Sequence, residues 1–154
     1  MTKHPPIKRD KALHGLSKDH HQGLLLCFKI RHGIKLGVDG ERINKYCKWF
    51  WQTYLKLHFS IEEEFVFPVL GRDDALVKQV LEEHKHLEEL FHRQQSDYDY
   101  LRKIEHDLEA HIRFEERVLF NKIQDIATEQ ELDTIAKNHA GESSCAVWED
   151  EFWR

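Results

Sequence analysis

The sequence predicts an all-α protein, an up-down-up-down four-helix bundle followed by a short C-terminal helix and a tail. Four long stretches carry apolar residues at the spacing of one helix face, and short turn signals separate them. No stretch alternates apolar and polar residues as a half-buried strand does. Long helices joined by short turns favour a bundle. We expect one domain over the 154 residues, with the bundle at about 13–123 and an extension at 124–154.

The first long helix is expected over residues 17–36. Ser17 is a favourable N-cap residue, and Asp19 in the first turn suits the positive end of the helix dipole. Gly37 stands where a left-handed residue commonly ends a helix. The preceding residues, 1–16, contain two prolines and are expected to form an irregular arm.

The second helix is expected over residues 41–67, because apolar residues keep one helical period through the whole stretch and Pro68 then ends it. A break of Gly and Asp residues leads into a third helix at about 75–93. The fourth begins after a short break near Ser96 and Asp97. Each predicted turn is short, so consecutive helices should be antiparallel neighbours.

The C-terminal region predicts one more helix and a packed tail. Thr128 and Glu131 form the pattern of a capping box, which opens a helix ending near Lys137. Trp148, Phe152 and Trp153 follow at a spacing that places them on one side of the chain. We expect this aromatic patch to pack across the end of the bundle.

Composition argues against several classes of protein. The formal net charge is -5 with acids and bases interleaved, so nothing indicates a nucleic-acid partner. No apolar run approaches the roughly 18 residues of a membrane span, and the polar N-terminus does not resemble a signal peptide. Three cysteines without a Cys-x-x-Cys pair, Cys27, Cys47 and Cys145, speak against a disulfide framework or zinc knuckle. A cytoplasmic setting is expected.

Histidine is over-represented, with 12 residues, and part of the excess lies in a repeated motif. Residues 58–68 read HFSIEEEFVFP and residues 111–121 read HIRFEERVLFN. The two match at the His, at carboxylates four and five residues on, and at the Phe nine on. A His and a Glu four residues apart lie on one helix face, and here apolar residues share that face. Buried ionisable groups need partners, so the repeat predicts a metal site with His58, Glu62, His111 and Glu115 as ligands.

The other two helices each offer further candidates. On the third helix, His84 is followed by Leu87, Glu88 and Phe91, so His84 and Glu88 are expected to face inwards. On the first helix, His21 is preferred to His20 because Leu24, Leu25 and Phe28 follow it at helical spacing, and His20 stays as the alternative or as a supporting residue. The full set of candidate metal ligands is His21, His20, His58, Glu62, His84, Glu88, His111 and Glu115.

The order His, His-x-x-x-Glu, His, His-x-x-x-Glu, together with the opening LSKDHHQGL, resembles the hemerythrin-like (HHE cation-binding) family over about residues 13–123. This resemblance implies a non-haem di-iron centre. It implies that Glu62 and Glu115 bridge two iron ions, that His84 and His111 bind one iron, and that His58 with His21 or His20 binds the other.

Two departures from the oxygen-carrying hemerythrins argue against reversible oxygen carriage. Those proteins have a second His where this chain has Glu88, and they have an Asp five residues after the last His, where Glu115 and Glu116 now stand at four and five. More carboxylates favour ferric iron, so we expect a di-iron protein that reacts with or senses O2, peroxide or NO, or handles iron, as a monomer or homodimer. Tyr54, one turn before His58, is expected to face inwards. The alternatives are a regulatory sensor without catalysis and a zinc-binding or structural bundle.

Overall fold

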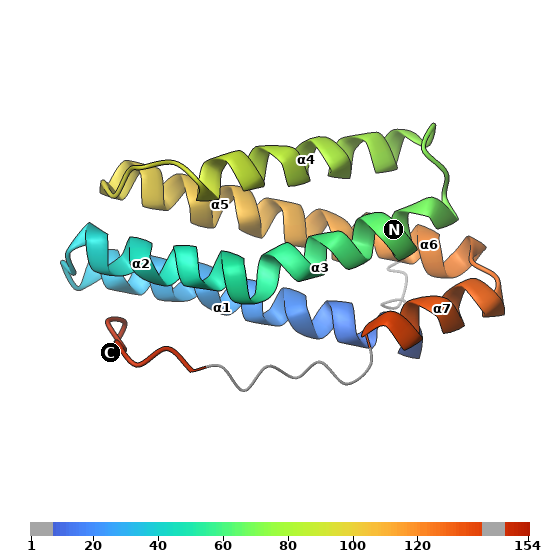
Figure 1. Cartoon of the computed structure of the whole chain (residues 1–154), viewed down its shortest axis with the longest axis horizontal. Helices are drawn as coiled ribbons and strands as arrows, with labels where there is room; N and C mark the ends of the chain where they lie inside the picture. Colours follow the sequence, from blue (N-terminus) through green and yellow to red (C-terminus); the bar gives the residue numbers. More distant parts are fainter. Residues whose placement is uncertain (1–7, 140–146) are drawn as a thin grey trace, which may run out of the picture.

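The computed structural model describes residues 8–139 and 147–154, and the chain is all-helical, with no strand in these ranges. Four long helical segments lie side by side, joined at alternate ends, and α7 lies across the end where α1 begins (Figure 1). The segments, with π-turns and 3-10 turns labelled η, are η1 Lys11–Leu13 with α1 His14–Lys35; α2 Gly40–Phe50, η2 Trp51–Leu55, α3 Lys56–Ile61, η3 Glu62–Val66 and η4 Phe67–Val69; α4 Ala75–Phe91; α5 Tyr98–Phe114, η5 Glu115–Leu119 and α6 Phe120–Ile126; and α7 Glu129–His139.

The first segment begins earlier than predicted. The Asp10 carboxylate accepts the Ala12 N–H and caps a 3-10 turn that runs directly into α1. Ser17 therefore lies inside the helix, and its hydroxyl donates to Glu116 instead of capping. The other end agrees with the prediction, because Gly37 has a φ of +72° just past the C-cap.

The second and fourth segments are continuous, as predicted, but they are not regular α-helices. Each contains a π-turn that begins at a glutamate: the Phe67 N–H donates to the Glu62 carbonyl, and the Phe120 N–H donates to the Glu115 carbonyl. A third π-turn occupies Trp51–Leu55. A π-turn widens the helix by one residue and often marks a functional site. The periodicity of apolar residues does not reveal a π-turn, because the apolar face of the helix shifts by only part of a turn.

Acidic residues of the predicted breaks cap the next two helices. Asp74 accepts the N–H groups that open α4, and Asp97 does the same for α5. At α7 the Glu131 N–H donates to the Thr128 hydroxyl at 3.1 Å, and the Thr128 N–H donates to the Glu131 carboxylate at 2.9 Å. The capping box expected from the sequence is confirmed.

Two buried apolar clusters fill the molecule, one towards each end. The aromatic tail extends the cluster at the α1–α2 turn, since Phe152 is buried against Tyr46 and against α1 at Gly33, where a Cβ atom would lie 2.9 Å from its ring. The expected packing of the tail is confirmed. The other cluster includes Ile135 of α7. Among the described residues no helix combines the length and apolar character needed to cross a membrane.

Candidate metal centre

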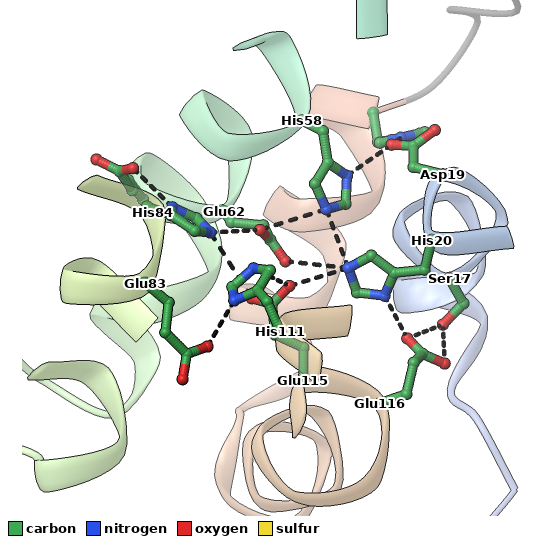
Figure 2. A network of polar contacts seen from close by, with 12 residues as sticks. Ser17, Asp19, His20, His58, Glu62, Glu83, His84, His111, Glu115 and Glu116 are labelled. Carbon is green, nitrogen blue, oxygen red and sulfur yellow. Dashed lines mark hydrogen bonds and ion pairs between the residues drawn. The ribbon is translucent and has the colours of Figure 1, made fainter. Parts of the chain in front are cut away.

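Six ionisable side chains from the four long segments meet inside the molecule, and all six are at most 4 % exposed. Each segment contributes at least one of them (Figure 2). They form two groups of four whose candidate ligand atoms lie within 4.8 Å of one another. The groups are His20, His58, Glu62 and Glu115, and Glu62, His84, His111 and Glu115. Both glutamates therefore belong to both groups.

Each glutamate lies between a histidine of its own helix and a histidine of another. The Oε1 atom of Glu62 is 3.3 Å from His58 Nε2 and 3.1 Å from His84 Nε2. The Oε1 atom of Glu115 is 3.1 Å from His111 Nε2 and 2.9 Å from His20 Nε2. All four histidines thus turn the same ring nitrogen, Nε2, towards the centre.

Several of the central atoms are buried without a hydrogen-bond partner. They are both carboxylate oxygens of Glu62, Glu115 Oε2, His84 Nε2 and His111 Nε2. Unpaired buried polar atoms are costly and uncommon in folded proteins. A set of inward oxygen and nitrogen lone pairs fits bound cations, which would satisfy these atoms together.

Four carboxylates bind the outward-facing nitrogens of the four central histidines. We call them the outer carboxylates: Asp19, Glu63, Glu83 and Glu116. Each accepts from the Nδ1–H of one histidine on a different helix. The pairs are Glu116 with His20 at 2.7 Å, Asp19 with His58 at 2.9 Å, Glu63 with His84 at 2.8 Å, and Glu83 with His111 at 2.6 Å. An ionised carboxylate only accepts, so each Nδ1 carries a proton, and each Nε2 presents a lone pair whenever the ring is neutral. This arrangement is the usual support for metal-bound histidine.

The contact between His20 and His58 also requires a positive charge at the centre. Their Nε2 atoms are 3.1 Å apart. With both Nδ1 protons donated to outer carboxylates, two neutral rings would point lone pairs at each other. A proton or a metal cation must lie between or beside them.

The electrostatics of the centre favour positive charge on its histidines. Burial lowers the pKa of His58, but the charge of Glu62 and the hydrogen bonds to Asp19 and Glu62 outweigh it and raise the pKa to about 9. His111 behaves likewise: Glu115 and Glu83 overcome burial and raise its pKa to about 10. Burial raises the pKa of Glu62, yet the facing histidines hold it well below its usual range. Without metal, protons on the histidines balance the buried carboxylates.

The outer carboxylate Asp19 is itself strongly ionised. Burial raises its pKa, but hydrogen bonds from His139 and His58 outweigh that effect and lower the pKa to about 2.

Aromatic rings pack against the central histidines. Phe59 stacks on His84 with ring centres 3.8 Å apart, and Phe120 stacks on His20 at 5.2 Å.

The preference for His21 is wrong about which histidine faces inwards: His21 is exposed and His20 is buried in the centre. The buried face of α1 includes Gly23, where a Cβ atom would lie 2.7 Å from Ile112 of α5. Helices α1 and α5 approach closely at this glycine. The prediction compared only the apolar side chains that follow each histidine, so Gly23 did not count in favour of His20. Gly23 lies three residues after His20 and marks the packed face of α1.

Glu88 is also outside the centre. It is exposed and lines a groove between α3 and α4 together with Lys56 and Lys85. The buried face of α4 passes through His84 and Leu87, and Glu88 lies beyond its edge. The expectation that Glu88 faces inwards is wrong. Of the eight candidates, the structure brings together His20, His58, Glu62, His84, His111 and Glu115.

The outer carboxylates were not recognised from the sequence, although a signal was available. Asp19 directly precedes His20, and Glu83 directly precedes His84. Glu63 and Glu116 are the second acids of the repeated motif. The acid next to each ligand position supports a histidine on the neighbouring helix.

Comparison with known families agrees with this geometry. The model of the Hemerythrin HHE cation binding domain matches residues 11–123. The chain belongs to the hemerythrin family. Searches of curated proteins and of solved structures gave no match. The family match ends before α7 and the tail, and it contains all six central residues.

Proposed function

We propose that the chain is a non-haem di-iron protein that binds and reacts with O2, peroxide or NO. The observation that carries the proposal is that both central glutamates belong to both groups of ligand atoms. Glu62 and Glu115 would bridge two ions, with His20 and His58 on one and His84 and His111 on the other. In the up-down-up-down bundle expected from the sequence, all four long helices then contribute to one centre.

Iron fits the donor set. Each ion would receive two imidazole nitrogens and two carboxylate oxygens, a mixture that suits iron and supports more than one oxidation state. The outer carboxylates keep the Nδ1 protons and thereby direct every Nε2 lone pair inwards. Four protein ligands per ion leave positions open for a small exogenous ligand, and the exposure of Glu88 leaves the third-helix position open too.

The space beside the centre favours a very small ligand. A cavity of about 10 Å³ lies against His20, His58 and His111, and apolar side chains such as Leu108 and Ile112 close it. That volume holds about one water-sized molecule. The inward-facing Tyr54 also lines it, which agrees with the expected position of this residue. O2, NO or peroxide would suit this cavity, which is too small for an organic substrate.

The test is metal analysis of the full chain produced in iron-rich medium. We expect two irons per chain, a near-ultraviolet absorption band in the oxidised form, and a change in that band when azide or peroxide is added. Peroxide turnover would identify an enzyme, and ligand binding without turnover would favour the sensor. Zinc in place of iron after iron-rich growth, or no bound metal, would overturn the di-iron proposal.

A further inference from the structure

A histidine outside the family match contacts the support of the metal centre. His139 is the last residue of α7, and its Nε2 lies 2.7 Å from Asp19 Oδ2. The same oxygen accepts the Nδ1–H of His58 at 2.9 Å. The side chain of His139 is only 17 % exposed. A continuous chain of hydrogen bonds therefore runs from α7 through Asp19 to a central histidine.

The fold makes room for this contact. The side chain of Ile135 anchors α7, since it is fully buried in the cluster that contains Leu13 and Leu16. On α1, Gly15 faces the imidazole: a Cβ atom there would lie 2.3 Å from His139 Nδ1 and 2.7 Å from Cε1. Any side chain at position 15 would displace the ring. The missing side chain at Gly15 and the buried anchor on α7 together hold His139 against Asp19.

The other outer carboxylates are supported differently. Glu116 accepts the Ser17 hydroxyl, and Glu83 accepts the side-chain amide of Gln79 on its own helix. Within residues 8–139 and 147–154, Asp19 alone among the four receives its second bond from a segment beyond the family match. The contact is therefore a feature of this chain and its C-terminal helix.

We infer that His139 is a positioning residue for the metal centre: by fixing Asp19 it orients His58 and strengthens the retention of the ion bound by His20 and His58. The inference rests on the proposed function, because it requires a cation at that pair. Outer partners of metal-bound histidine typically contribute about 10–100-fold to metal affinity. His139 acts one step further out, so we expect roughly a threefold to tenfold effect on metal release, below the range for direct partners.

The experiment measures the release of iron from the loaded full chain to an excess of chelator. His139→Ala should speed the release of one iron per chain and leave the other rate unchanged. Gly15→Ala should do the same while His139 itself remains, because the added methyl group moves the ring away. His139→Gln should keep the parent rates, since the amide nitrogen of Gln can donate to Asp19 from nearly the same place.

A matched control comes from the same helix. Lys137→Ala removes an exposed side chain that pairs with Asp133, and it should leave both rates unchanged. Parent-like release from both His139→Ala and Gly15→Ala would overturn the inference and leave the di-iron proposal intact. Faster release of both ions in His139→Gln as well would show only loosening of α7, and would also overturn it. A parent chain that binds no metal would instead refute the proposed function.

Discussion

The two halves of the centre have the same kinds of candidate ligand but different surroundings. Each half combines two helices in the same way. One helix contributes a histidine that directly follows an acid, and the next helix along the chain contributes the His-x-x-x-Glu-Glu motif with its Phe. We call the half with His20 and His58 the closed half and the half with His84 and His111 the open half. The shared plan explains why four histidines show the same Nδ1 and Nε2 geometry.

The outer carboxylates show where the halves diverge. In the closed half, Glu116 and Asp19 receive further hydrogen bonds from α1 and α7. In the open half, the Glu63 side chain is 45 % exposed and lines a groove of about 260 Å³ between α3 and α4, which also reaches His84. A repeated motif thus fixes which atoms point inwards, while the neighbouring segments decide how firmly each half is supported. We expect the open half to exchange its ion first.

Replacing a glutamate that belongs to both groups should have the largest effect on metal binding. It should also remove the difference between the two halves. Glu62→Gln or Glu115→Gln removes a charge that faces both groups of ligand atoms, so both ions should be lost. The affinity should fall by more than the roughly 100-fold upper range for outer partners. His58→Ala or His111→Ala removes a ligand from one group only, and each should first lose the ion of its own half. Metal analysis after desalting measures this, and equal retention in all four variants would contradict it.

The pH dependence should have opposite signs in the metal-free and metal-bound proteins. Carboxylates outweigh burial and raise the pKa of His58 to about 9 and of His111 to about 10, above the usual value of 6.5. A raised pKa stabilises the folded state fully below about pH 6.5, and this contribution is lost as the pH rises through the folded pKa values. The melting temperature of the metal-free protein should therefore fall from about pH 6.5 to 10.

Metal binding requires neutral Nε2 atoms, so the affinity for iron should rise over the lower part of the same range. Calorimetry of chelator-treated and loaded protein at several pH values measures both trends. A melting temperature of the metal-free chain that stays constant or rises up to pH 10 would show that the histidines are not protonated in the way the geometry implies.

Two outer carboxylates at equivalent positions of the motif sharpen the comparison. Glu116→Gln removes the negative charge and one of the two oxygens that accept from His20 and Ser17, at a side chain that is 29 % exposed. A loss of affinity within about 10–100-fold is expected. Glu63→Gln removes the same negative charge beside His84, but the Glu63 side chain is 45 % exposed and water can substitute there, so its effect should be smaller. Chelator competition measures both metal affinities. The reverse order would show that the exposure of an outer carboxylate does not determine how much it contributes to metal affinity.

The sequence predicted the all-helical fold, the capping box of α7 and the buried His and Glu residues of the repeated motif, because these depend on local spacing. Helical period and capping residues identify the long segments, and the repeat identifies His58, Glu62, His111 and Glu115. Three features depended on packing between helices and were not predictable in this way. They are the close approach at Gly23, the π-turns at Glu62 and Glu115, and the carboxylates that support histidines of other helices.

The smallest effects are expected at the two candidates that the structure leaves outside the centre. His21 and Glu88 are both exposed, and neither belongs to a group of possible ligand atoms among the described residues. His21→Ala should retain two irons and the parent melting temperature, whereas His20→Ala should lose metal from the closed half. Glu88→Ala should likewise keep both irons. It changes only the rim of the groove, so reoxidation after anaerobic reduction should proceed within about twofold of the parent rate, because an exposed charge is well screened. Loss of metal in His21→Ala would mean that α1 is rotated by one residue in solution, and much faster reoxidation in Glu88→Ala would place Glu88 next to the iron of the open half.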